Sequence, residues 1–399
     1  MSKAADIVLA NDDLVRTLKE RVNRKNMELM AFHQNKAKRN KALSGSMLAK
    51  KRSEIVDKLI KQALSELGFN DLKNVSVVAL GGYGRNELCP YSDVDIMFLY
   101  KPRNKTLAKE ATEKLLYLLW DLGLDVGHSV RTIDECIELS QEEDTTILTS
   151  LLDSRFVCGS EQLYMDLDKK IYCQLLPSIS HKFIQGKIRE NEQRLNKFGR
   201  SVYLLEPNVK EGEGGLRDIH YALWIAQAKF KVKNFSDLLP KGILMENEIR
   251  IFEKSLNFLL LIRSELHYLA GRREDRLGFE FQEKIAKFLG FKDAELPAVE
   301  RFMRIYYLRG NELREQSKRL IEKCLMDHKS GIRTAKTVTL DNSFIIQGGM
   351  LSASNINIFR DDPVNLMRAF EYADKYQVKM SNYLLDLIRE NVSVTTMDE

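Results

Sequence analysis

Along most of the chain, apolar residues recur at the three- and four-residue spacing of amphipathic helices. This spacing predicts a first helix over residues 5–43, which Ser44-Gly45-Ser46 interrupts. Ser53 is placed to cap a second helix, and Gly68 is placed to end it. The apolar face of that second helix comprises Ile55, Leu59, Ile60, Ala63, Leu64 and Leu67.

Three segments instead have the compact, β-branched pattern of buried strands. They cover residues 75–80, 94–100 and 124–130, and a helix is predicted over 105–122. The later part of the chain is almost wholly helical in pattern. Helices are predicted at 133–141, 144–156, 160–174, 180–196, 217–232, 245–270, 279–289 and 296–326. Strand-like residues return only at 337–340 and 344–347, and two last helices begin at Asp362-Pro363 and near residue 380. A small sheet followed by many helices predicts an α+β fold.

The elements divide the 399 residues into four predicted parts. They are a basic helical arm over 1–52, a sheet-containing core over 53–158, a helical bundle over 159–330 and a small strand/helix segment over 331–399. Apolar residues make up 44% of the chain, which is enough to bury a sizeable core and excludes a mainly disordered protein. No apolar run approaches the roughly 20 residues of a membrane-spanning helix, so no membrane partner is expected.

Five scattered cysteines form no Cys-x-x-Cys pair, which argues against a disulfide framework and a structural zinc site. The first ten residues also lack the pattern of a signal peptide. Together these features predict a protein of the reducing cytoplasm.

The formal charge of +5 is unevenly distributed. Residues 16–52 hold twelve Lys or Arg against two Glu, a net +10, so the rest of the chain sums to −5. A basic arm of this kind can bind nucleic acid or another acidic partner. The alternative is an ordinary solvated helix face.

The stretch with the clearest chemistry runs from Gly81 to Asp95. A predicted strand ends in Gly81-Gly82-Tyr83-Gly84, where backbone amides can approach an anion closely because no Cβ intervenes. Asp93 and Asp95 follow at the head of the next predicted strand, and strand alternation puts both carboxylates on one face. Adjacent carboxylates repel unless a cation lies between them, and hard oxygen ligands suit magnesium. A phosphate-binding turn beside metal-binding carboxylates is what nucleotidyl transfer requires.

Each half of this pattern is weak alone. Gly-Gly turns are common, and an isolated Asp-x-Asp pair is as often a turn or a helix cap. The combination, with a strand before and a strand after, is much more specific.

Several motifs resemble one family in order along the chain. Gly-Gly-Tyr-Gly-Arg-x-Glu-Leu from Gly81 and Pro-Tyr-Ser-Asp-Val-Asp from Pro90 look like the nucleotidyltransferase domain of the PII uridylyltransferase/uridylyl-removing enzyme, within the DNA polymerase β-like superfamily. The likeness extends over roughly residues 50–390. It continues in the segments 118–132, 205–210, 214–220, 272–277 and 299–303.

The resemblance implies the small mixed sheet of the polymerase β-like nucleotidyltransferase fold, followed by a largely helical domain. It implies that Asp93 and Asp95 hold magnesium, with manganese as an alternative. Gly81, Gly82 and Ser92 would contact the triphosphate, with Arg85 nearby. A third catalytic carboxylate is expected on a neighbouring strand.

Asp125 is the candidate for this third carboxylate, on the face of the third strand opposite its apolar residues. The alternative for Asp125 is a solvated residue at a strand start. Asp153, interpreted as helical, is a weaker candidate.

A second glycine-rich turn spans residues 210–218 and leads into a helix. By resemblance, Lys210 and Arg217 would bind the nucleotide. The alternative is an ordinary loop and helix cap, with Arg217 and Asp218 paired structurally. Three further arginines, Arg272, Arg273 and Arg276, could contact phosphate, but they are interleaved with acids and favour a structural ion-pair cluster.

The resemblance implies transfer of UMP from UTP to a hydroxyl of a PII-type nitrogen regulatory protein. None of the six histidines is followed directly by Asp, and the chain ends where the His-Asp phosphohydrolase and ACT domains of that family would begin. Uridylyl removal and glutamine sensing are therefore not expected. Two alternatives stay open. The first is adenylyl or other nucleotidyl transfer to a different protein or to RNA, and the basic arm would favour the RNA acceptor. The second is a catalytically silent nucleotide-binding module.

Overall fold

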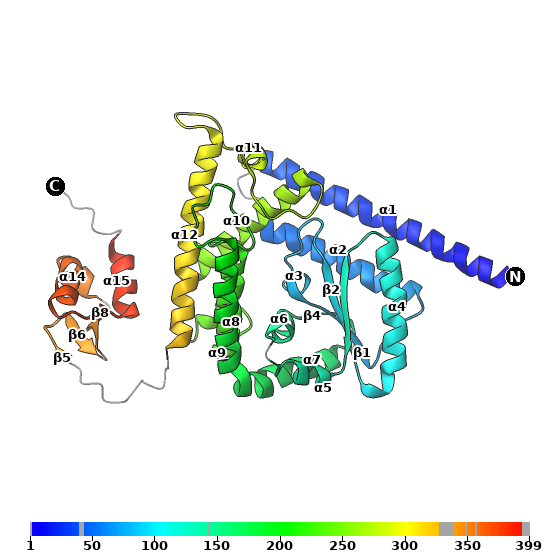
Figure 1. Cartoon of the computed structure of the whole chain (residues 1–399), viewed down its shortest axis with the longest axis horizontal. Coiled ribbons are helices and arrows are strands. Elements are labelled where there is room, and N and C mark those ends of the chain that lie inside the picture. Colours follow the sequence, from blue (N-terminus) through cyan, green and yellow to red (C-terminus); the bar gives the residue numbers. More distant parts are fainter. Residues whose placement is uncertain are drawn as a thin grey trace. The chain divides into compact units, whose positions relative to one another are not determined.

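The computed structural model of the protein describes residues 2–39, 44–142, 144–326, 338–347, 349–355 and 357–392. The chain divides into two compact units, Met1–Leu325 and Met326–Glu399. The first two predicted parts, and the third up to residue 325, thus belong to one unit. Its elements are drawn in Figure 1.

A four-stranded mixed sheet lies in the first unit, in the order β3-β2-β1-β4. The strands are β1 (Val75–Ala79), β2 (Val94–Tyr100), β3 (Val126–Arg131) and β4 (Arg155–Gly159). β1 pairs antiparallel with β2 and with β4, whereas β2 and β3 are parallel. Parallel neighbours need a crossover, which the helix α4 (Lys105–Asp121) provides.

The two faces of this sheet pack against different helices. Val77, Ile96 and Phe98 face a core shared with α2 (Gly45–Glu66) and α4. The alternate residues Met97 and Leu99 belong to a larger core that extends through the helical part of the unit. Since Asp93 and Asp95 alternate with the first set, they point toward the helical part.

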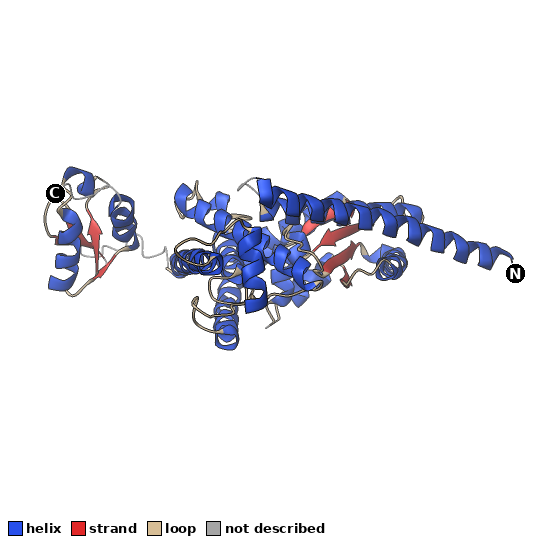
Figure 2. Cartoon of the chain, turned by 90° about the horizontal axis from the view of Figure 1, so that it is seen from above, coloured by secondary structure: helices blue, strands red, loops and turns tan. Residues whose placement is uncertain are grey.

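The helical part surrounds α9, which is buried along most of its length. Figure 2 shows that helices dominate the chain. The helices following β3 are α5 (Ile133–Leu139), α6 (Thr146–Leu152), α7 (Glu161–Lys170), α8 (Leu176–Phe198), α9 (Leu216–Phe230), α10 (Glu246–Ala270), α11 (Phe279–Phe288) and α12 (Ala298–Leu325), with a π-helical segment at Ile171–Leu175 and short 3₁₀ turns at Pro102–Asn104 and Phe235–Leu238. No helix in the described ranges has the length and apolar content needed to cross a bilayer.

The basic arm forms α1 (Ser2–Arg39), which packs on α2 and α11. Leu18 and Leu29 are buried on its inner side. His33 is also buried, with Nε2 2.7 Å from Oε2 of Glu265 on α10. The arm is therefore anchored to the rest of the unit along its described inner face.

Two predictions about local structure are wrong. The predicted helix over 144–156 is shorter, and residues 155–159 form the edge strand β4. Ser53 lies inside α2, where its hydroxyl donates to the carbonyl of Ala49 at 3.1 Å. The helix begins instead at Gly45, because Ser44 accepts from the backbone N–H of Met47 at 3.2 Å.

The second unit has its own sheet, in the order β5-β6-β7-β8. Its core includes Phe344, Leu351, Ile358 and Leu384. The elements are β5 (Val338–Thr339), β6 (Phe344–Gln347), β7 (Met350–Ala353), α13 (Ile358–Asp361), α14 (Asn365–Lys375), β8 (Lys379–Met380) and α15 (Asn382–Val392). β7 and β8 were not predicted from the sequence, and residue 337 lies outside the described residues.

Candidate active site

A cavity of about 630 Å³ lies between the sheet and the helical part of the first unit. Of the nine site residues predicted from the sequence, eight line it and Asp125 does not. The eight are Gly81, Gly82, Arg85, Ser92, Asp93, Asp95, Lys210 and Arg217. Segments more than 100 residues apart therefore meet at one site.

The first glycine turn forms the short helix α3 (Gly81–Gly84) directly after β1. Gly81 has φ +52°, a conformation that favours glycine. A Cβ on Gly82 would come no closer than 3.9 Å to another group, the Arg85 side chain. The backbone at Gly82 is therefore open to the cavity.

The carboxylate of Asp95 lies beside this turn and beside β3. The register of β2 and β3 sets Asp95 opposite Gly127. A Cβ on Gly127 would lie 2.3 Å from Oδ1 of Asp95, so only glycine leaves room for the carboxylate. Burial raises the pKa of Asp95, and the charges of Asp93 and Asp125 raise it further. This accumulation of negative charge favours a bound cation.

Asp125 immediately precedes β3, and its carbonyl accepts from the backbone N–H of Val94 at 2.9 Å. The residue is exposed. Within the described residues, no three His, Cys, Asp or Glu side chains are grouped to hold a metal ion together. The catalytic role of Asp125 therefore stays a prediction.

The residues present nevertheless fit a magnesium ion. Magnesium is commonly held by one or two carboxylates, with waters and substrate phosphates completing its shell. Asp93 and Asp95 supply the two carboxylates. The buried hydroxyl of Ser92, beside Asp93, has no hydrogen-bond partner among the described residues, which leaves it available to a phosphate oxygen.

Arg85 is held within a buried polar network. Its Nε donates to Glu87 at 2.9 Å, and Nη1 donates to Oδ2 of Asp153. Trp224 donates to the other oxygen of Asp153 at 2.8 Å. Asp153 therefore lines the cavity with both of its carboxylate oxygens already bound, by Arg85 and by Trp224.

His220 completes this network. Burial lowers its pKa to about 3, with Arg85 adding to the effect, so the ring is neutral and its Nε2 donates to Glu87 at 2.8 Å. Burial alone would raise the pKa of Glu87, but Arg85 and His220 hold it well below its usual range. The carboxylates of Glu87 and Asp153 are thus both paired with Arg85, and this network holds the residues at the base of the cavity in place.

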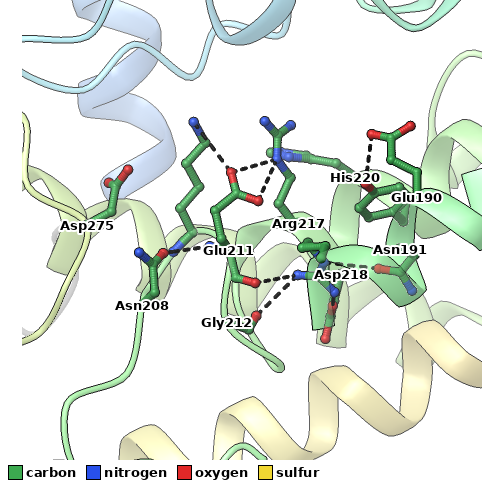
Figure 3. A network of polar contacts seen from close by, with 12 residues as sticks. Glu190, Asn191, Asn208, Glu211, Gly212, Arg217, Asp218, His220 and Asp275 are labelled. Carbon is green, nitrogen blue, oxygen red and sulfur yellow. Dashed lines mark hydrogen bonds and ion pairs between the residues drawn. The ribbon is translucent and has the colours of Figure 1, made fainter. Parts of the chain in front are cut away.

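The second glycine turn presents cations to the cavity (Figure 3). Nε of Arg217 donates to both carboxylate oxygens of Glu211, at 3.1 and 3.3 Å. Asp218 instead pairs with Arg194 and accepts from the N–H of Gly214 at 2.7 Å. The alternative that paired Arg217 with Asp218 is therefore wrong, because Asp218 points back under the turn.

Lys210 stands at the start of this turn. Burial lowers its pKa to about 8, and the nearby charges of Arg217 and Arg263 contribute. Its own charge in turn favours the ionised form of Asp95, and both residues line the cavity.

A buried lysine in the cavity wall was missed from the sequence. Lys187 on α8 donates to Glu190 at 2.7 Å, and its Nζ lies 4.8 Å from the ring centre of Trp224. Lys187 follows Phe183 and Ile184 on the buried stripe of α8, as Arg194 does two turns later. The sequence signal that could have revealed Lys187 is a cationic residue at a position of the buried, otherwise apolar stripe of a helix.

The end of α10 holds the loop that carries Ser92 and Asp93. Ser264 donates to Sγ of Cys89 at 3.6 Å, and Nδ1 of His267 donates to the carbonyl of Pro90. Arg263 donates to Asp275 at 2.6 Å, which ties the following loop to the same helix. The helical part thus positions the acidic residues of the sheet.

The three clustered arginines have different partners. Arg272 pairs with Glu274 at 3.1 Å, and Arg276 pairs with Glu206. Arg273 instead lines the cavity, and its Nη1 donates to Oδ2 of Asp93 at 2.7 Å. The predicted structural ion-pair cluster therefore applies to Arg272 and Arg276 but not to Arg273.

Comparison with known proteins agrees with the two parts of the site. Residues 58–155 match a family model described as a nucleotidyltransferase domain, and residues 182–321 match one described as GlnD PII-uridylyltransferase. The bifunctional uridylyltransferase/uridylyl-removing enzymes of two Caulobacter vibrioides strains, NA1000/CB15N and ATCC 19089/CIP 103742/CB 15, are each 38% identical over 315 residues. That alignment covers 76% of this chain and 33% of each relative, so the chain spans about a third of their length.

The fold, the cavity and these matches define an enzyme of the nucleotidyltransferase class. Within that class, the chain carries the nucleotidyltransferase domain of the PII uridylyltransferases.

Proposed function

We propose that the protein transfers UMP from UTP to a hydroxyl of a PII-type regulatory protein in the cytoplasm, with magnesium bound at Asp93 and Asp95. The observation that carries this proposal is the meeting of an open glycine turn, a pair of like-charged carboxylates and several cations in one cavity. The named activity of the Caulobacter vibrioides relatives supports the choice of uridylyl transfer.

The reaction joins the acceptor oxygen to the α-phosphorus and breaks the bond between the α-phosphorus and the β-phosphate oxygen. Pyrophosphate leaves, and the hydroxyl proton must go to a base. When bound, magnesium would neutralise the triphosphate and lower the cost of the charge that develops at the reacting phosphorus. Asp125 is the carboxylate that we assign to receive the proton, because it is close enough to influence Asp95 yet exposed to an incoming acceptor.

The chain's own residues have separate tasks in this proposal. The open backbone at Gly82 and the hydroxyl of Ser92, which no described residue binds, would contact phosphate oxygens. Lys210 and Arg217 would neutralise the remaining phosphate charge from the opposite wall. Arg85 would act indirectly, since its guanidinium is already paired with Glu87 and Asp153.

The test incubates the full chain with a PII-type protein, magnesium and one α-labelled nucleotide at a time: UTP, ATP, CTP or GTP. We expect label on the acceptor with UTP, and loss of that label with Asp95→Asn. Labelling by ATP alone, or labelling of RNA in place of protein, would select the alternative donor or acceptor. Nucleotide binding without transfer to any acceptor would contradict the proposed activity.

A further inference from the structure

Arg273 occupies one of the two carboxylates to which the proposed metal would bind. Its Nη1 lies 2.7 Å from Oδ2 of Asp93, and both side chains are about two-fifths exposed, at 44% and 40%. An ion pair this exposed is weak, typically about 1 kcal/mol or less. The contact can therefore be broken by a stronger competitor for the carboxylate.

The backbone that carries Arg273 is, in contrast, firmly held. The carbonyl of Asp275 accepts from the N–H of Val209 at 2.8 Å, and the Asp275 carboxylate is bound by Arg263. Leu277 donates its N–H to the carbonyl of Pro207 at 2.9 Å. A side chain on such a loop can change partners without moving away from the cavity.

A second acid keeps the guanidinium near the cavity. Nε of Arg273 lies 4.0 Å from Oδ2 of Asp275. A divalent cation at Asp93 would compete for that carboxylate and repel the guanidinium, whereas a triphosphate would attract it strongly. With Asp275 nearby in both states, Arg273 can thus pair with Asp93 before substrate arrives and with the triphosphate afterwards.

We propose that Arg273 is a nucleotide-binding residue that rests on Asp93 in the free enzyme and moves to the triphosphate when metal and nucleotide bind. This inference rests on the proposed function, because it assumes that Asp93 takes the metal. It predicts opposite effects of one substitution: losing Arg273 removes a competitor of the metal and also removes a ligand of the nucleotide.

The test compares Arg273→Ala with wild type in the full chain, using calorimetry rather than turnover. In the absence of nucleotide, Mn²⁺ should bind Arg273→Ala more tightly, by up to about fivefold, which is the typical range of an exposed pair. At saturating metal, a non-reactive UTP analogue with a methylene bridge between the α- and β-phosphates should bind about tenfold or more weakly, because a charged hydrogen bond to phosphate is lost.

Arg272→Ala is the matched control, since Arg272 is 74% exposed, does not line the cavity and pairs only with Glu274 in the described structure. It should leave both affinities unchanged. A parallel fall of both affinities in Arg273→Ala would show that the pair merely holds Asp93 in place and would overturn the inference, as would unchanged affinities. If wild type bound neither Mn²⁺ nor the analogue, the proposed function itself would fail; normal wild-type binding with no opposite effects would refute only the role of Arg273.

Discussion

The two glycine-rich turns that meet at the cavity contain similar residues in very different surroundings. In the first turn, Gly82 has open space where a side chain would be. In the second, a Cβ on Gly214 would lie 2.7 Å from the backbone oxygen of Gly310 on α12. The missing side chain of Gly82 therefore leaves room for a ligand, whereas that of Gly214 lets the second turn pack closely against α12.

The charges carried by the turns differ in the same way. The first turn leads to Asp93 and Asp95, where burial and the mutual repulsion of the carboxylates raise the pKa of Asp95 although the exposed Arg273 is paired with Asp93. In the second, the buried acid Asp218 is already satisfied by Arg194 and the N–H of Gly214. The acids that follow the first turn are therefore only weakly paired within the protein, whereas the buried acid of the second turn is fully paired.

The largest effect is expected from a branched side chain in the second turn. Gly214 has φ +74°, and its missing side chain faces backbone atoms that cannot rotate away. Gly214→Val should therefore cost about 3 kcal/mol or more of unfolding free energy and abolish activity with the fold. Thermal unfolding followed by circular dichroism measures this loss.

Gly242→Val separates backbone strain from steric overlap. Gly242 has φ +65°, but no atom of the described residues lies within 4 Å of the position that a Cβ would take. Gly242→Val should therefore lower the unfolding free energy by only about 1–2 kcal/mol. Equal losses at Gly214 and Gly242 would mean that packing against Gly310 contributes nothing.

Removal of one carboxylate charge after the first turn should have the next largest effect, on chemistry rather than on folding. Asp95→Asn keeps the shape of the side chain opposite Gly127 but removes the charge that would hold the metal. Turnover should fall by about two to four orders of magnitude, because metal-based charge stabilisation contributes several kcal/mol. Label transfer from UTP and the melting temperature are measured on the same sample; a folded variant with wild-type transfer would contradict the assignment.

The valine substitution has a smaller expected effect in the first turn. Gly82→Val should leave the melting temperature nearly unchanged, since its Cβ meets nothing within 3.9 Å. Nucleotide affinity should fall by about tenfold, because the side chain blocks approach of phosphate to the backbone. Calorimetry with the methylene-bridged analogue measures this, and unchanged affinity would show that phosphate binds elsewhere.

The smallest effect concerns the dependence of binding on pH. Burial lowers the pKa of Lys210 to about 8. Lys210 is therefore charged below that pH and neutral above it, so its contribution to phosphate binding is present at lower pH and lost as pH rises through about 8. Analogue affinity measured between about pH 7.5 and 9 should decrease in wild type. In Lys210→Met it should be lower and nearly constant, and an identical decrease in both proteins would exclude Lys210 as its source.

Local periodicity was sufficient to predict several parts of the site. Strand alternation is a property of neighbouring residues, so Asp93 and Asp95 could be assigned to one face from the sequence. The role of Gly127 depends on the register between β2 and β3, which one sequence does not reveal. The α+β fold and most helix positions were confirmed for the same local reason.

The failures share a different cause. β4 has five residues and only two residues separate it from the end of α6, so the helical pattern before it hid a short edge strand. Ser53 resembled a helix cap, but the cap of α2 is Ser44. Ser53 lies nine residues further along, inside the helix, where its hydroxyl donates to the carbonyl of Ala49. The partners of Arg217 and Arg273 lie on loops whose paths depend on the tertiary fold, and charge alone could not distinguish them.

The hold of α10 on the loop before Asp93 constrains the order of events during synthesis. Cys89 contacts Ser264, which lies 175 positions later in the sequence, and Pro90 contacts His267, which lies 177 positions later. At about 5–20 residues per second, a ribosome needs roughly 10–35 s to add that intervening length. During that interval the strands and the loop that carries Asp93 leave the ribosome before α10, the helix that holds the loop in place. Nucleotidyl transfer therefore begins only after α10 has emerged.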